Sequence, residues 1–157
     1  MDISIEDIRA PDYSPQQRDI LAYGETLDVK LDRDDILREA REQTGLGDFG
    51  DEEFLTRLDL LVDEWSSDAG LNNLGRLNLR SKLVQHASSR LLIQHTLKQH
   101  PEIQEIPIEA PIIVAGLPRS GTTHLLNLLA ADTRLRSLPL WESYEPVPRP
   151  GEGLLEG

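Results

Sequence analysis

Residues 111–129 read PIIVAGLPRSGTTHLLNLL, and this stretch decides the fold that the sequence predicts. Residues 111–115 are apolar and rich in β-branched side chains, which favours a buried β-strand. Residues 116–121 form a loop bounded by two glycines, and the leucines that follow have a helical spacing. Strand, glycine-bounded loop and helix in this order are typical of sites that bind phosphate at a helix N-terminus. The stretch therefore predicts an α/β fold with a P-loop-like, three-layer parallel-sheet core.

The loop departs from the usual nucleotide-binding pattern at one informative position. Residues 116–123, G-L-P-R-S-G-T-T, match both glycines and the final threonine of the pattern G-x-x-x-x-G-K-S/T. Thr122 stands where that pattern has the lysine that contacts the β- and γ-phosphates. Arg119 instead supplies a cation from within the loop. The loop thus favours a single 5′-phosphate group without an obligatory metal, and a P-loop kinase or NTPase-like nucleotide binder stays as the alternative.

Hydrogen-bond donors surround this loop. The backbone N–H groups of residues 120–123 and the hydroxyls of Ser120, Thr122 and Thr123 can encircle one phosphate. The N-terminus of the following helix adds a partial positive charge.

Residues 1–109 are predicted to be a mostly helical N-terminal region, and residues 110–157 the incomplete start of the P-loop-like core. Only one further strand, Leu135 to Trp141, is expected after the loop helix. Capping residues and apolar periodicity predict four helices before the loop. They start at Pro15 after Ser14, at Arg33 after Asp32, after Asp51, and at Asn72 or Asn73, and the last one ends near Gln99 before His100 and Pro101.

Composition limits the classes of partner. The net charge is −12, and residues 1–70 carry 20 acidic and 7 basic side chains, which argues against nucleic acid as a partner. No apolar run approaches the ~20 residues that cross a bilayer. The sequence contains no cysteine and no secretory signal pattern, so the prediction is a cytoplasmic protein. Nothing in the sequence indicates the oligomeric state.

Residues 116–126, GLPRSGTTHLL, resemble the 5′-phosphosulfate loop of sulfotransferases that use 3′-phosphoadenosine 5′-phosphosulfate (PAPS). The form PRSGTT is similar to the bacterial branch and to the tyrosylprotein sulfotransferases. Residues 70–80, GLNNLGRLNLR, and the pair Trp141 and Glu142 also resemble the N-terminal half of the bacterial family. The resemblance covers roughly residues 35–148.

This resemblance implies a chemistry and a set of site residues. PAPS would be the co-substrate, no metal is expected, and a sulfuryl group would move to a hydroxyl or amine of a small-molecule, lipid or carbohydrate acceptor. Arg119 would be catalytic by stabilising negative charge on the leaving oxygen, and Glu142 would be the general base, with Glu145 as the other candidate. The cofactor-binding residues implied are Pro118, Arg119, Ser120, Gly121, Thr122 and Thr123.

The same resemblance implies that the chain is an N-terminal segment. Family members bind the 3′-phosphate of PAPS with an arginine and a serine that follow the region seen here, and residues 143–157 offer only Arg149. The chain alone is therefore expected to be inactive. The acidic first 70 residues keep a further alternative open, namely a non-catalytic fragment that acts as a helical interaction module.

Overall fold

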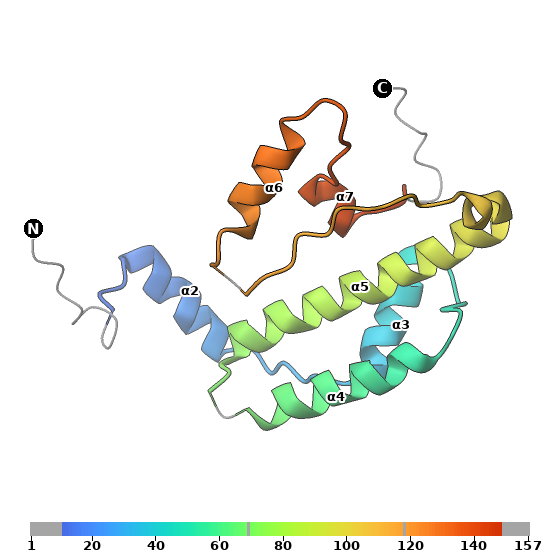
Figure 1. Ribbon diagram of the computed structural model, residues 1–157. Coiled ribbons are helices and arrows are strands. Elements are labelled where there is room, and N and C mark those ends of the chain that lie inside the picture. Colours follow the sequence, from blue (N-terminus) through green and yellow to red (C-terminus); the bar gives the residue numbers. More distant parts are fainter. Residues whose placement is uncertain (1–10, 69, 118, 149–157) are drawn as a thin grey trace, which may run out of the picture. The chain divides into compact units, whose positions relative to one another are not determined.

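The computed structural model describes residues 11–68, 70–117 and 119–148 (Figure 1). Helices dominate these ranges. In chain order they are α2 (Pro15–Glu25), α3 (Arg33–Thr44), α4 (Glu53–Ser67), α5 (Asn73–Gln99), the 3₁₀-helix η1 (Pro101–Glu105), α6 (Thr122–Ala130) and α7 (Leu140–Tyr144).

The chain divides into two compact units. The first comprises Met1–Gln43 and Asp51–Ala87, and the second comprises Thr44–Gly50 and Ser88–Gly157. Helix α5 therefore contributes its first part to one unit and its last part to the other. These two units do not test the predicted boundary between a helical N-terminal region, residues 1–109, and the start of the core at residue 110. That boundary stays a prediction.

Side-chain caps confirm most of the helix starts predicted before the loop. The Ser14 hydroxyl accepts from the backbone N–H of Gln17, whose side chain accepts in return from the N–H of Ser14, so α2 begins with a capping box. Asp32 accepts from the N–H of Asp35 at 2.9 Å, and Asn72 accepts from the N–H of Gly75 at 2.8 Å. These caps satisfy N–H groups that have no acceptor within the helix.

The first unit is built on apolar side chains from three helices. Arg33 on α3 pairs with Asp59 on α4 at 3.1 Å, and Arg80 on α5 pairs with Glu39 on α3, so polar contacts at the edges join the same helices. Within the described part of this unit, the buried apolar residues are Leu31, Ile36, Leu37, Ala40, Leu58, Val62, Leu83, Val84 and Ala87.

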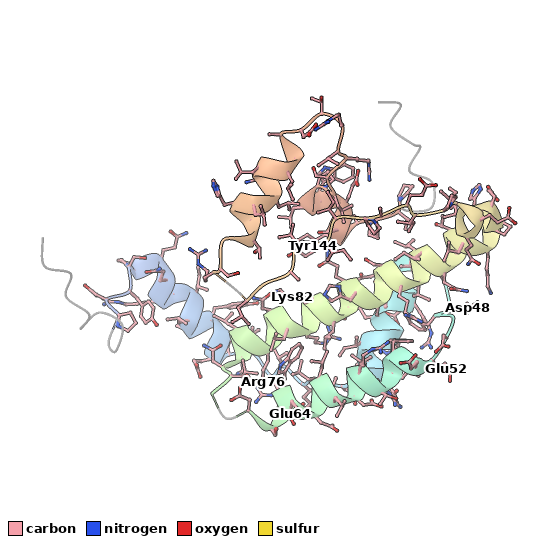
Figure 2. All side chains as sticks on the ribbon, in the orientation of Figure 1. Asp48, Glu52, Glu64, Arg76, Lys82 and Tyr144 are labelled. Carbon is pink, nitrogen blue, oxygen red and sulfur yellow. The ribbon has the colours of Figure 1, made fainter. Side chains whose placement is uncertain are left out.

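Arg76, at the start of α5, closes the end of α4. Its guanidinium donates to the carbonyl oxygens of Trp65 at 3.3 Å, Ser66 at 3.4 Å and Asp68 at 3.2 Å. Figure 2 shows Arg76 beside the end of α4, near Glu64. The last carbonyl groups of a helix carry partial negative charge and receive no hydrogen bond from an N–H group within the helix, so a cationic donor there is favourable.

In the second unit, residues 44–50 are bound along the last part of α5. Arg90 donates to the carbonyl oxygen of Phe49 at 2.8 Å, and Lys98 pairs with Asp48, which Figure 2 places near the end of α5. Hydrogen bonds from Lys98 and from the N–H of Gly50 lower the pKa of Asp48. Among the residues of this unit that the structure describes, the buried apolar ones are Phe49, Leu91 and Leu92.

The predicted parallel-sheet core is wrong for the part of the chain that the structure describes, because those residues contain no β-strand. Residues 111–117 are neither helix nor strand. The second strand, predicted from Leu135 to Trp141, is also absent, and the last two residues of that range belong to helix α7, which begins at Leu140. A strand needs a neighbouring backbone to accept and donate its hydrogen bonds. Ile112 and Ile113 are 61% and 81% exposed, so none of the described residues covers them as the neighbouring layer of a sheet core would.

None of the helices in the described ranges has both the length and the hydropathy of a membrane-spanning segment.

We expect Leu91→Ala to destabilise the chain by about 2–5 kcal/mol, because Leu91 is 0% exposed and its truncation leaves a cavity. Leu77→Ala is the matched control on the same helix, since Leu77 is 38% exposed, and it should cost less than about 1 kcal/mol. Urea unfolding followed by circular dichroism measures both. Equal losses in the two variants would contradict the burial of this face of α5.

Candidate functional site

The loop between residues 116 and 121 makes a tight turn with two left-handed residues. The backbone N–H of Ser120 donates to the carbonyl oxygen of Leu117 at 3.2 Å. Arg119 has a φ of 67° and Gly121 a φ of 90°. Glycine adopts such angles freely, whereas a non-glycine residue there is strained, and strained residues gather at binding sites. Pro118, predicted to bind the cofactor, lies outside the described residues.

Gly116 is required by the close return of the chain. A Cβ atom at this position would lie 2.7 Å from the Ser120 hydroxyl oxygen and 2.8 Å from the Cγ2 of Thr122. Any larger residue would therefore push these two side chains away. The structure thus brings Gly116, Ser120 and Thr122 together.

The start of α6 presents N–H groups without an acceptor in the helix. Its N-cap is Gly121, which has no side chain to cap the helix, and the first helical hydrogen bond runs from the N–H of Leu125 to the carbonyl oxygen of Gly121 at 3.1 Å. The N–H groups of residues 122–124 therefore have no intrahelical partner. Helix ends of this kind bind phosphate and other anions.

The Arg119 side chain is the cation of the loop. It is exposed, as are Ser120 and Thr123, whereas Thr122 is half-buried. Arg119 forms no ion pair with any residue that the structure describes. Its guanidinium is therefore available to an anionic ligand at the loop.

Glu142 lies in the short helix α7 and does not follow a strand, because the strand predicted from Leu135 to Trp141 is not formed. Its two carboxylate oxygens accept hydrogen bonds from Nη2 of Arg136 at 2.9 and 2.7 Å. Among the described residues, no hydrogen bond joins Glu142 to the loop at residues 116–123. The sequence analysis did not predict that Arg136 contacts Glu142. The sequence signal for this contact is Pro139, which lies between Arg136 and Glu142 and starts helix α7.

The second candidate base, Glu145, follows α7 directly. Its backbone N–H donates to the carbonyl oxygen of Trp141 at 2.9 Å. The hydroxyl of Ser89 on α5 donates to the carbonyl oxygen of Tyr144, labelled in Figure 2, at 3.3 Å. This contact connects the end of α7 with the second part of α5.

An ion pair between Asp132 and Arg134 stabilises the turn after α6. Asp132 accepts hydrogen bonds from Nε, Nη2 and the backbone N–H of Arg134 at 2.9, 2.6 and 3.0 Å. These hydrogen bonds lower the pKa of Asp132 and raise that of Arg134. Arg134 is thus engaged within its own turn. Nowhere in the described ranges do three His, Cys, Asp or Glu side chains gather as metal ligands would.

We expect Gly116→Ala to displace the loop, because the added methyl group would contact Ser120 and Thr122 within 3 Å. The backbone amide signals of Leu117 and of residues 119–123 in ¹⁵N-resolved NMR spectra should shift. Gly47→Ala is the matched control, since no atom lies within 4 Å of its Cβ position, and it should leave those signals in place. Unchanged loop signals in Gly116→Ala would contradict the close return of the chain.

Comparison with known proteins finds similarity to sulfotransferases. Residues 111–154 match the sulfotransferase family. Sulfotransferase STF1 from Mycobacterium tuberculosis is similar at a TM-score of 0.69 and 37% identity, covering 78% of this chain and 34% of that chain. Sulfotransferase STF9 from Mycobacterium avium is similar at a TM-score of 0.69 and 32% identity, covering 78% of this chain and 31% of that chain. No curated protein sequence matches the chain.

The chain therefore spans about a third of the length of these two solved structures. The residues that match the family model, 111–154, include the whole glycine-bounded loop and helices α6 and α7. The family match over residues 111–154 and the two likenesses together support a sulfotransferase family for this chain, which corresponds to a part of such a protein.

Proposed function

We propose that this chain is the N-terminal segment of a PAPS-dependent sulfotransferase and that it carries the part of the site that binds the 5′-phosphosulfate. The observation that carries the proposal is the close approach of Gly116 to Ser120 and Thr122 in the loop, which lies within the residues matched to the family. The cytoplasmic location predicted from the sequence stays a prediction.

The residues of the loop fit the phosphosulfate group of PAPS. Residues 116–124 contain no carboxylate, and they combine exposed N–H groups, three hydroxyls and one guanidinium. When bound, PAPS supplies a sulfuryl group whose transfer forms an acceptor oxygen–sulfur bond and leaves adenosine 3′,5′-bisphosphate. Ser120, Gly121, Thr122 and Thr123 would hold the 5′-phosphate through their N–H and hydroxyl groups.

Arg119 has the role of a catalytic cation in this proposal. The bond from sulfur to the bridging oxygen breaks during transfer, so negative charge grows on that oxygen. A guanidinium donates hydrogen bonds to such an oxygen and stabilises the charge in the transition state. The exposed and unpaired position of Arg119 among the described residues supports this role.

Glu142 is the proposed general base. A carboxylate near the acceptor accepts the proton of the attacking hydroxyl or amine while the oxygen–sulfur or nitrogen–sulfur bond forms. Glu145 is the other candidate. The acceptor would be a small molecule, a lipid or a carbohydrate. We expect transfer to require the remaining two thirds of the family fold, because the residues for the 3′-phosphate are not identified in this chain.

A kinase or NTPase is disfavoured by Thr122, which occupies the place of the lysine that a triphosphate site needs. A kinase-like site would bind Mg-ATP, whereas the proposed site would bind adenosine 3′,5′-bisphosphate without a metal. A helical interaction module would bind neither nucleotide.

Arg119→Ala should weaken the binding of adenosine 3′,5′-bisphosphate roughly tenfold or more, since a hydrogen bond to a charged group contributes about 1.5–3 kcal/mol. Calorimetry would be performed on the full chain and on the full chain fused to the part of M. tuberculosis STF1 that it does not match, called the fused enzyme below. Release of adenosine 3′,5′-bisphosphate from PAPS, with a phenol, a sugar and a lipid alcohol as acceptors, measures transfer. This transfer should be lost in Arg119→Ala.

Arg134→Ala is the matched control, because that arginine is exposed and is engaged with Asp132 in its own turn. It should bind and react like the wild type. The proposed function is wrong if wild-type protein binds Mg-ATP but not adenosine 3′,5′-bisphosphate. Full transfer in Arg119→Ala would remove that residue from the catalytic site.

A further inference from the structure

The ion pair between Arg136 and Glu142 lies in the second unit, and the proposed mechanism gives Arg136 no role. Nη2 of Arg136 lies 2.9 Å from one carboxylate oxygen of Glu142 and 2.7 Å from the other. The Arg136 side chain is 76% exposed, while that of Glu142 is only 22% exposed. The arginine thus approaches from the solvent side, and the carboxylate is the more enclosed partner.

Helix α7 needs such a contact to hold Glu142 in one place. The helix spans only Leu140–Tyr144, and its N-cap, Pro139, forms no side-chain hydrogen bond with it. Short helices are marginal in water unless contacts from elsewhere hold them. The Ser89–Tyr144 hydrogen bond holds the end of α7, but it does not involve the Glu142 side chain.

A general base depends on its position. It must lie within hydrogen-bonding reach of the proton that it accepts, and a free glutamate side chain samples several rotamers. Arg136 restricts Glu142 by contacting both carboxylate oxygens with one nitrogen. A carboxylate has about four lone-pair sites, so this contact leaves sites for the proton of the acceptor.

We propose, on the basis of the proposed function, that Arg136 is a positioning residue that orients the Glu142 carboxylate for proton transfer from the acceptor. Arg136 itself touches neither the donor nor the acceptor. Arg134, two residues earlier, serves as the internal comparison, because it pairs with Asp132 in the turn after α6. Of these two arginines, Arg136 is the one that contacts α7.

The test is a double-mutant cycle in the fused enzyme. Arg136→Ala should lower kcat about tenfold to a hundredfold, part of the ~10²–10⁴-fold effect of a general base, with KM for PAPS unchanged within about twofold. Arg136→Lys should recover most of kcat, because a lysine keeps a charged donor. In a Glu142→Gln background, Arg136→Ala should cause no further loss. Arg134→Ala should leave kcat and KM at the wild-type values.

Several results would overturn this inference while leaving the proposed function intact. They are an unchanged kcat in Arg136→Ala, a loss that appears in KM for PAPS, and a full additional loss in the Glu142→Gln background. If the wild-type fused enzyme neither binds adenosine 3′,5′-bisphosphate nor transfers sulfate, the proposed function itself fails.

A second measurement uses the full chain alone and needs no activity. The ¹³C signal of the Glu142 carboxyl carbon should move in Arg136→Ala and stay in place in Arg134→Ala. The amide spectrum of each variant verifies that the chain remains folded. A Glu142 signal that does not respond to loss of Arg136 would show that the arginine does not hold the carboxylate, and it would overturn the inference.

Discussion

Burial of the apolar face of α5 is the interaction on which the rest of the structure depends. Leu83, Val84 and Ala87 are buried in the first unit, and Leu91 and Leu92 are buried in the second. Each fully buried large aliphatic side chain contributes about 1.5–3 kcal/mol relative to exposure. The other buried apolar residues come from α3, α4 and the adjoining segments, so each unit is assembled on a different part of one helix.

Arginines on α5 then fix the polar groups around this apolar face. Arg76 satisfies the carbonyl oxygens at the end of α4, Arg80 pairs with Glu39, and Arg90 binds the carbonyl oxygen of Phe49. These contacts orient neighbouring segments and satisfy backbone groups that would otherwise lack partners. The contacts of these arginines are with the chain itself, and Arg119 in the loop is the cation that we propose for the candidate site.

The loop at residues 116–121 forms without a sheet because its constraints are local. The Ser120–Leu117 turn, the close approach at Gly116 and the left-handed Gly121 all lie within a few residues of one another. The leucines of α6 are different, since Leu125, Leu126 and Leu128 are exposed. Their helical spacing was predicted correctly, but spacing alone does not say whether another element covers them.

The sequence by itself determined that helices start directly after Ser14 and Asp32 and at Asn72 or Asn73, that α5 ends before His100 and Pro101, and that a glycine-bounded loop precedes α6. All of these depend on hydrogen bonds or steric limits between residues close along the chain. Only the tertiary structure decided that residues 111–117 are not a strand, that Glu142 lies in α7, and that Arg136 contacts it. A strand requires a paired backbone, and a side-chain pair requires the intervening turn to bring its members together, so neither follows from local propensity.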